Sequence, residues 1–527
     1  MLFTSLQFVV FLAVLTVVYY LLPARFQWPV LLLGSVFFYY SIAHKLLVFV
    51  LFSGTAAWLA ACGIDRVNLA EKKAVAQVKE AGGDRAARQA AKKRFLPVRS
   101  AILVLFLLCT AGLLLIFKFY NMFAELAGEY GIGLPALRLA MPLGISFYTL
   151  MLITYFMDVY HARITAEKNP AKVILYTCFF PQVIQGPICR WGESAPQIFK
   201  THRFSYENLV LGCERMLWGY FKKLVIADRL QLLTSALYSG YETYQGFYVV
   251  VAAFAYTVQL YADFSGGIDI ALGAAEVLDI HLTENFNRPF FSKNISEFWR
   301  RWHITLGNFL REDLFYPLTL FAKPITALSR FFKKRKMRWA AKWIPTYIAM
   351  LIVWFISGLW HGEGWQYIAN GLWHGFLITG GETIAGPSAR LWNRLGVPED
   401  SLTLKLFRVC RTFCLVAIGE IMFRSESTAM MTGMLKGLFA VFNPWILFDG
   451  SLLAFGLDGK DFVVLFAAVL ILLGASLAAR KGSVRNWLNR QELPIRWGIL
   501  LAGLFSIVVF GVYGPAYDPT PFIYFQF

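Results

Sequence analysis

Two neighbouring stretches carry most of the candidate chemistry of this chain: Ser296–Pro317, which reads SEFWRRWHITLGNFLREDLFYP, and Trp354–Gly375, which reads WFISGLWHGEGWQYIANGLWHG. They contain three of the seven histidines, two adjacent arginines and six tryptophans, in a chain that is otherwise rich in apolar residues. Ionisable side chains at membrane depth cost several kcal/mol unless they line a cavity or are paired, so a membrane protein that keeps them is expected to use them. We therefore expect the rest of the chain to hold His303 and His361 near a tunnel.

The composition predicts a membrane protein. Of the 527 residues, 58% are hydrophobic and 16% are charged, which is outside the range of soluble proteins and within that of multi-pass membrane proteins. The formal charge of +18 comes from basic residues that gather in a few loops between apolar spans. That pattern indicates membrane topology and contact with anionic lipid headgroups, so we predict a lipid environment and no nucleic-acid partner.

Several chemical signatures are missing. The seven cysteines form no CxxC pair and no metal-type cluster with histidine, so we predict no metal site. The sequence also has no GxSxG, Walker A, HExxH or strand-to-helix GxGxxG motif. The usual signatures of serine hydrolysis and ATP-driven transport are therefore absent.

Three basic segments set the predicted topology: residues 64–99, 328–343 and 480–496. Lys and Arg favour the cytoplasmic side of a membrane, so we expect all three inside and both termini outside. A window of ~20 residues per span gives about 11 transmembrane helices, with re-entrant and interfacial helices besides. The predicted fold class is an all-α polytopic membrane bundle, and we expect residues 1–527 to form a single integral-membrane domain.

Three local patterns predict departures from straight spans. Ile174–Arg190 contains two internal prolines, which indicates a segment that dips into the bilayer and lines a cavity. Glu207–Leu230 mixes aromatic and charged residues, as in a tilted or interfacial helix. The polar run Asp263–Gly267, inside an apolar sequence, predicts a helix break that is packed on protein.

His361 is the strongest catalytic candidate. It lies between Gly358 and Gly362, which allow backbone or substrate to approach closely. A neutral imidazole in a water-poor tunnel takes a proton from a hydroxyl and returns it to a leaving thiolate. The alternative is a core histidine bonded to a carbonyl. His374 repeats the GLWHG pentapeptide, but a continuous helix would place it about 220° away from His361, so we expect a structural role for it.

His303 follows Trp299, Arg300, Arg301 and Trp302. Adjacent arginines beside tryptophans suit an anionic ligand such as a phosphate-bearing carrier, because guanidinium groups bind phosphate oxygens and stack on aromatic rings. The alternative is that these arginines snorkel from an interfacial helix towards nearby acidic residues.

Several motifs, in order along the chain, resemble the membrane-bound O-acyltransferase family and, within it, the bacterial alginate O-acetylation branch. They are Pro142–Thr149 (PLGISFYT), Tyr155–Tyr160 (YFMDVY), Phe179–Arg190 (FFPQVIQGPICR), Tyr261–Gly267, Glu284–Phe290 (ENFNRPF), Ser296–Leu310, Gly358–Gly375 and Phe522–Phe527 (FIYFQF). The resemblance implies that residues 142–375 form the family's core, a helical bundle around a central tunnel in a bacterial plasma membrane.

The resemblance also implies a reaction. Relatives transfer an acyl group, usually acetyl from cytoplasmic acetyl-CoA, to an acceptor outside, so the donor is a substrate and no cofactor is bound. His361 matches the family's invariant histidine and would act as general base, with His303 assisting or positioning. Partners implied are an extracytoplasmic SGNH-type acetyltransferase or the acceptor polysaccharide itself. The residues expected to bind the donor are Trp299, Arg300, Arg301, Trp302 and Trp360.

Other functions stay open. The acceptor is not identified, because alginate, peptidoglycan and cellulose acetylation would each use such a subunit. A teichoic acid D-alanyl transfer protein, whose donor is a carrier protein, is the second possibility. A transporter would be expected to show repeated halves, and the sequence has none. A non-enzymatic scaffold for polysaccharide export is the remaining class.

Overall fold

The computed structural model of the protein describes residues 1–137, 140–513 and 522–523. These described residues form helices, turns and loops and contain no strand, which confirms the predicted all-α class. The chain divides into two compact units. The first is Met1–Leu209 with Ala274–Thr283, and the second is Val210–Gly273 with Glu284–Phe527.

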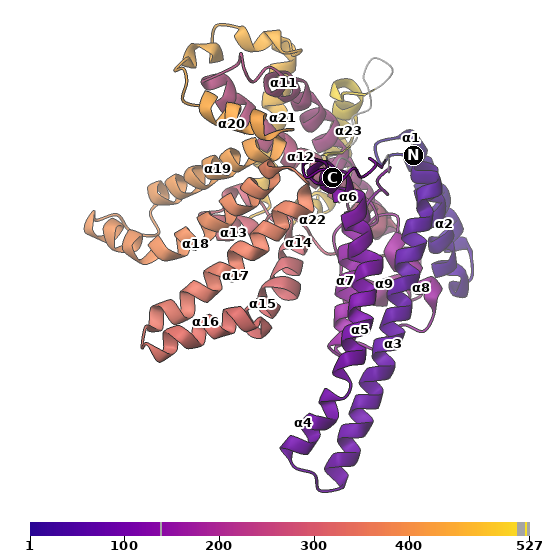
Figure 1. Cartoon of the computed structure of the whole chain (residues 1–527). Coiled ribbons are helices and arrows are strands. Elements are labelled where there is room, and N and C mark those ends of the chain that lie inside the picture. The colour runs from indigo at the N-terminus through magenta and orange to yellow at the C-terminus, as the bar shows by residue number, and fades with distance from the viewer. Residues whose placement is uncertain (138–139, 514–521, 524–527) are drawn as a thin grey trace. The chain divides into compact units, whose positions relative to one another are not determined.

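The helices that lie wholly within the first unit are labelled in Figure 1. They are α1 (Leu6–Leu21), α2 (Gln27–Ala43), α3 (Leu47–Glu80), α4 (Arg85–Lys93), α5 (Leu96–Leu107), α6 (Leu113–Glu129), α7 (Ile145–Tyr160), α8 (Pro170–Cys178) and α9 (Trp191–Ile198).

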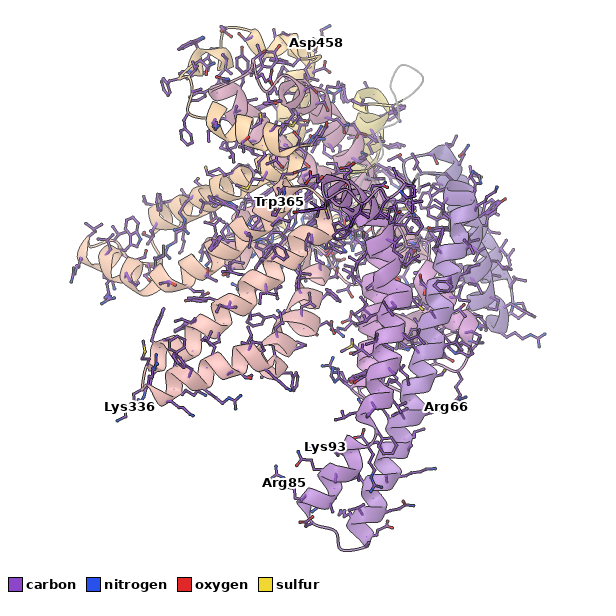
Figure 2. All side chains as sticks on the ribbon, viewed as in Figure 1. Arg66, Arg85, Lys93, Lys336, Trp365 and Asp458 are labelled. Atoms are coloured by element: carbon purple, nitrogen blue, oxygen red, sulfur yellow. The ribbon has the colours of Figure 1, made fainter. Side chains whose placement is uncertain are left out.

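The basic segment 64–99 is a helical hairpin. Helix α3 continues without interruption from its apolar part into this basic segment, and the chain then turns at Gly82, which has a φ of 75°. Asp84 begins α4 by accepting a hydrogen bond from the backbone N–H of Ala87 at 2.7 Å. Figure 2 shows Arg85 and Lys93 on this short helix. The basic charge therefore gathers at the end of two extended helical arms.

The predicted re-entrant segment is irregular backbone buried inside the first unit. Helix α8 ends at Cys178, and residues 179–189 are all buried. Arg190 closes the segment, since its Nη1 lies 3.0 Å from Asp158 Oδ1 on α7. Non-helical backbone at membrane depth is tolerated where protein covers it, as it does here.

The second unit holds most of α10 and all the later helices except the end of α12. They are α10 (Tyr206–Tyr220), α11 (Asp228–Ser239), α12 (Phe247–Val277), α13 (Ile295–Trp299), α14 (Ile304–Phe309), α15 (Tyr316–Phe321), α16 (Lys323–Lys334), α17 (Arg338–His361), α18 (Trp365–Arg394), α19 (Leu402–Arg424), α20 (Thr428–Gly437), α21 (Gly459–Ala478), α22 (Val484–Asn489) and α23 (Leu493–Phe510). Lys336, in the basic loop 328–343, marks the turn between α16 and α17 in Figure 2.

The predicted break at Asp263–Gly267 is wrong, because α12 runs through it without interruption. Gly266 in this run lets α12 touch α10, because a Cβ atom on Gly219 of α10 would lie 2.6 Å from the carbonyl oxygen of Gly266. Asp263 accepts from the backbone N–H of Ile523 at 2.9 Å, near the end of the described chain. The last four residues of the FIYFQF motif, 524–527, lie outside the described residues.

The segment Glu207–Leu230, predicted to be a tilted or interfacial helix, is buried at its centre, which contradicts the interfacial alternative; its tilt stays a prediction. Its centre is a π-helical turn, η4 (Phe221–Ala227), in which every residue is buried. Lys222 Nζ lies 2.6 Å from Asp269 Oδ2, and Lys223 Nζ lies 2.6 Å from Asp263 Oδ1. The carboxylates of α12 therefore compensate both cations inside the protein, which sequence periodicity could not reveal.

Six helical segments of the described residues are long and apolar enough to cross a membrane, and two shorter apolar helices accompany them. This supports a multi-pass protein, while the predicted total of about eleven spans stays a prediction. The six segments are Ala24–Glu80, Arg85–Glu129, Phe247–Val277, Arg338–His361, Gly459–Ala478 and Leu493–Phe510.

Candidate functional site

His361 sits at the end of a tight helical hairpin. It is the last residue of α17, and α18 begins after a short turn. A Cβ atom on Gly358 would lie 2.5 Å from the carbonyl oxygen of Tyr367, and one on Gly371 would overlap the carbonyl oxygen of Trp354. The two GLWHG pentapeptides thus place their first glycines where the helix backbones touch. Glycine is required there because no side chain fits.

The second pentapeptide puts His374 in the core. Its ring centroid lies 4.9 Å from that of Trp299 and 5.8 Å from that of Trp354, and the residue is buried. The turn after His361 removes the continuous helix on which the 220° estimate rested, yet the packing between two tryptophans agrees with the structural role expected of His374.

His361 is packed between aromatic rings and is only 7% exposed. Its centroid lies 4.8 Å from the ring of Trp360 and 5.0 Å from the ring of Phe423, which meets it edge-on from α19. Side chains of two helices, α17 and α19, therefore pack against this imidazole. Phe423 was not singled out from the sequence, because its proximity depends on a contact between distant segments.

His303 begins α14 with a φ of 45°, a left-handed conformation that is rare outside glycine. It is buried, and its Nδ1 lies 3.2 Å from Asn285 Oδ1. The same oxygen accepts from the backbone N–H and the hydroxyl of Thr305, at 3.1 and 3.0 Å. A backbone N–H can only donate, so this atom of Asn285 is its oxygen and His303 Nδ1 donates to it. Nε2 is then the basic nitrogen of the ring.

Asn285 is a site residue that the sequence interpretation missed. It belongs to the ENFNRPF motif, Glu284–Phe290, and its side chain is completely buried. A polar amide inside an aromatic motif was the available signal, since buried polar groups require hydrogen-bond partners.

Trp360 joins the two histidines. Its ring centroid lies 6.4 Å from that of His303 and 4.8 Å from that of His361. The structure therefore brings together three predicted site residues, from α17 and from the start of α14, around one indole ring.

The four residues before His303 have different surroundings. Arg301 Nη2 lies 2.6 Å from Glu297 Oε1 one turn earlier, so Arg301 is paired with Glu297 and not with the acidic residues that follow His303. Trp302 is buried in an aromatic cluster and stacks on Phe298 at 5.5 Å. Both support the segment from within. Arg300 is exposed.

Trp299 and Arg300 line a cavity of about 550 Å³ in the second unit, which we call the Trp299 cavity. Its walls combine aromatic side chains with two arginines and one carboxylate, Glu382, and neither His303 nor His361 belongs to its lining. The residues that give it this character are Trp299, Arg300, Arg311, Trp343, Tyr347 and Trp354. This combination fits a ligand with both negative charge and flat or apolar surface.

Among the described residues, no group of three or more His, Cys, Asp or Glu side chains has the arrangement needed to hold a metal ion.

Comparisons with known proteins agree with this geometry. The sequence model of the membrane-bound O-acyltransferase family matches residues 164–332, a region that contains His303 and Asn285. A probable alginate O-acetylase AlgI from Pseudomonas aeruginosa is 32% identical over 335 residues, 64% of this chain and 58% of that protein. A peptidoglycan O-acetyltransferase from Helicobacter pylori is 33% identical over 304 residues, 53% of this chain and 54% of that protein.

A more distant relative is the teichoic acid D-alanyltransferase of Bacillus subtilis, which is 26% identical over 252 residues, 46% of this chain and 60% of that protein. The chain thus spans between half and two thirds of the length of the relatives it matches. The matches and the helical architecture together give one result: this multi-pass membrane protein matches the sequence model of the membrane-bound O-acyltransferase family over residues 164–332, and it is similar to probable alginate O-acetylases over 56–58% of their length.

Proposed function

We propose that this protein is the membrane subunit of an O-acetylation system, which takes acetyl groups from cytoplasmic acetyl-CoA and delivers them across the membrane for a polysaccharide. The observation that carries the proposal is that two buried histidines both lie close to the ring of Trp360. Relatives named for O-acetylation of alginate and of peptidoglycan support the acyl-transfer class.

In this proposal His361 is the general base. It removes the proton from an acceptor hydroxyl as the oxygen attacks the thioester carbonyl carbon, the carbon–sulfur bond breaks, and the proton passes to the leaving thiolate. His303 positions the thioester or shares the proton. Its hydrogen bond to Asn285 supports that role, because it fixes the ring and keeps Nε2 basic.

The Trp299 cavity is the proposed donor site. Arg300 and Arg311 would meet the phosphates of coenzyme A, while Trp299 and Trp354 would flank the pantetheine arm. Arg301 and Trp302 act indirectly in this scheme, since Arg301 is paired with Glu297 and Trp302 is packed in the core. Trp360 would contact the thioester itself.

The proposed orientation follows the basic loops. With residues 64–99, 328–343 and 480–496 in the cytoplasm, both termini lie outside. The acceptor on that side would be a polysaccharide or an SGNH-type acetyltransferase that passes the group on. Which polysaccharide is acetylated is left to experiment.

The second candidate function is D-alanyl transfer to teichoic acid from a carrier protein. The relative from Bacillus subtilis favours it, because its match extends over 60% of that protein. A carrier-protein donor would dock on the surface around the Trp299 cavity instead of entering it.

The decisive experiment uses membranes that contain the full-length protein, with radiolabelled acetyl-CoA on one side and the acceptor fraction on the other. We expect transfer in the wild type, loss in His361→Gln and His303→Gln, and retention in His374→Gln, which makes the same change in the repeated pentapeptide. Transfer that survives in His361→Gln would overturn the mechanism. Label taken only from a D-alanylated carrier protein would replace the proposed donor.

A further inference from the structure

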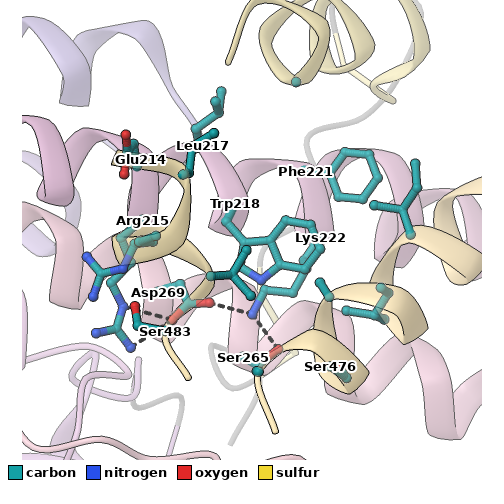
Figure 3. Close-up of a pocket in the computed structure, with 18 of the residues that line it drawn as sticks. Glu214, Arg215, Leu217, Trp218, Phe221, Lys222, Ser265, Asp269, Ser476 and Ser483 are labelled. Carbon is teal, nitrogen blue, oxygen red and sulfur yellow. Dashed lines mark hydrogen bonds and ion pairs between the residues drawn. The ribbon is translucent and has the colours of Figure 1, made fainter. Parts of the chain in front are cut away.

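A second cavity, of about 700 Å³, lies within the second unit among α10, η4, α12, α21, α22 and α23. Figure 3 shows it with the side chains that line it. It shares no lining residue with the Trp299 cavity, and no step of the proposed reaction uses it. Its volume is within the ~300–1,000 Å³ of typical small-molecule sites.

One part of this cavity is apolar and borders lipid-facing helices. Only 17% of the most apolar window of α21 and 6% of that of α23 is buried by protein, so most of their surface faces lipid. A hydrocarbon chain can reach the cavity along them. The apolar lining residues are Leu217, Trp218, Phe221, Ile471, Leu472, Ile499 and Leu500.

The inner polar wall is already neutral. Arg215 makes a two-pronged contact with Glu284, at 2.7 and 2.6 Å, and its Nε lies 3.0 Å from Asp269. Lys222 Nζ lies 2.6 Å from Asp269 and 2.8 Å from the hydroxyl of Ser265. Figure 3 shows the links from Arg215 through Asp269 and Lys222 to Ser265. Two cations and two carboxylates balance here, so this wall by itself does not call for an anion.

The other charged side chains of the cavity give an excess of positive charge. Arg288 and Arg485 are partly buried lining residues, and Arg485 Nη1 donates to the carbonyl oxygen of Leu211 at 2.9 Å, which holds α22 against α10. The remaining carboxylate of the lining, Glu214, lies 3.6 Å from Arg496. Three arginines thus accompany one carboxylate, so this part of the cavity is cationic beside the apolar lining.

We propose that this cavity binds an anionic phospholipid from the leaflet that meets the basic loop 480–496. One acyl chain lies between α10–η4 and α21–α23, and the phosphate contacts Arg288 and Arg485. Guanidinium groups match phosphate oxygens in shape and charge, and anionic lipids concentrate at basic cytoplasmic loops. A soluble nucleotide ester fits less well, because it would face the apolar walls with polar groups.

The site has a structural link to the imidazole pair. Phe286 lines the cavity and its ring lies 5.1 Å from Trp302 and 5.0 Å from Phe264, whose ring in turn lies 4.8 Å from His303. An acyl chain in the cavity would pack behind this aromatic cluster. Occupancy should therefore raise the thermal stability of the protein.

The test uses full-length protein purified in detergent and titrated with dioleoyl phosphatidylglycerol or dioleoyl phosphatidylcholine, with bound lipid counted by native mass spectrometry. The charge variant is Arg288→Ala with Arg485→Ala. Its matched control is Arg480→Ala with Arg490→Ala, which removes the same charge from exposed positions of the basic loop. The volume variant is Ala475→Phe, which fills the cavity, and its control is Ala467→Phe on the exposed face of the same helix.

We expect tight phosphatidylglycerol binding in the wild type and in both controls. The charge variant should raise the Kd about tenfold or more, since a charge-assisted hydrogen bond contributes at least one factor of ten. Ala475→Phe should abolish the tight site and the thermal stabilisation that phosphatidylglycerol gives.

Three results would overturn the proposal. Equal loss in the Arg480/Arg490 control would show a general effect of loop charge. Equal affinity for phosphatidylcholine would remove the anionic headgroup from the recognition. Binding of coenzyme A that depends on Arg288 and Arg485, with phosphatidylglycerol unaffected, would assign the cavity to a soluble phosphate ester. If Ala475→Phe does not fold, the charge variant and its control decide.

Discussion

Replacing Asn285 with alanine tests how His303 is held. The side-chain oxygen of Asn285 accepts from His303 Nδ1 and from two donors of Thr305, and the residue is completely buried. An oxygen with two lone pairs satisfies two donors well, and each buried donor left unpaired costs about 1–3 kcal/mol. Asn285→Ala should therefore lower the free energy of unfolding by about 2–6 kcal/mol. It should also release the ring from its fixed tautomer.

The assay is acetyl transfer at saturating acetyl-CoA, with thermal unfolding of the same detergent preparation. If releasing the ring removes about 1.4 kcal/mol of transition-state stabilisation, the turnover falls about tenfold. We expect at least that loss in Asn285→Ala. The control is Asn287→Ala in the same motif, where the side chain is exposed and accepts from Arg288. Wild-type turnover in Asn285→Ala, or an equal loss in Asn287→Ala, would refute the positioning of His303 by this amide.

Three further predictions concern stability. Gly371→Ala should destabilise the protein by about 1–3 kcal/mol, because the added methyl group overlaps the facing helix. The control is Gly380→Ala on the same helix, which has open space around it and should stabilise the protein by about 0.5–1 kcal/mol. Equal unfolding temperatures of the two variants would contradict the predicted overlap at Gly371. Lys223→Met leaves the buried carboxylates of Asp228 and Asp263 without their shared cation, and should lower the free energy of unfolding by about 3–5 kcal/mol. Size-exclusion chromatography should then show a loss of folded protein, and a wild-type yield would contradict the prediction. Burial alone raises the pKa of Asp279, but the hydrogen bond from His202 and nearby positive charge outweigh it and lower the pKa below its ordinary value. The stabilising contribution of this carboxylate is thus present above about pH 4 and is lost as the pH falls through the lowered pKa. Asp279→Asn should therefore reduce the unfolding temperature at pH 7, and the difference from wild type should shrink as the pH falls below about 4; a difference that does not depend on pH would contradict this.

Hydropathy and composition were sufficient to predict a helical, multi-pass membrane protein. Both are sums over local sequence, and the bilayer imposes one solution on an apolar segment, namely a helix whose backbone hydrogen bonds are internal. The position of the basic hairpin 64–99 followed in the same way. The motifs around His303 and His361 indicated the family because long residue patterns in a fixed order are specific.

Contacts between residues that are distant in the chain determined the features that the sequence did not predict. The run Asp263–Gly267 has the composition of a helix break, yet it is helical, because Gly266 meets Gly219 and Asp263 meets Lys223 on a neighbouring element. The same pairing buried the lysines of an expected interfacial helix. A buried carboxylate and its ammonium partner lie on different segments. When each segment is considered alone, each group looks like a polar interruption of an apolar sequence.

The sequence by itself determined which side chains are the candidates for chemistry, since His303, Trp360 and His361 stand out by residue type in an apolar chain. Only the tertiary structure decided how they lie relative to each other and to their neighbours: the indole of Trp360 close to both imidazoles, the amide of Asn285 that sets the tautomer of His303, and the ion pair between Arg301 and Glu297. The physical reason is the distance over which each interaction acts. Hydrophobicity acts on each segment alone, whereas hydrogen bonds and ion pairs act over about 3 Å between atoms that the fold must first bring together.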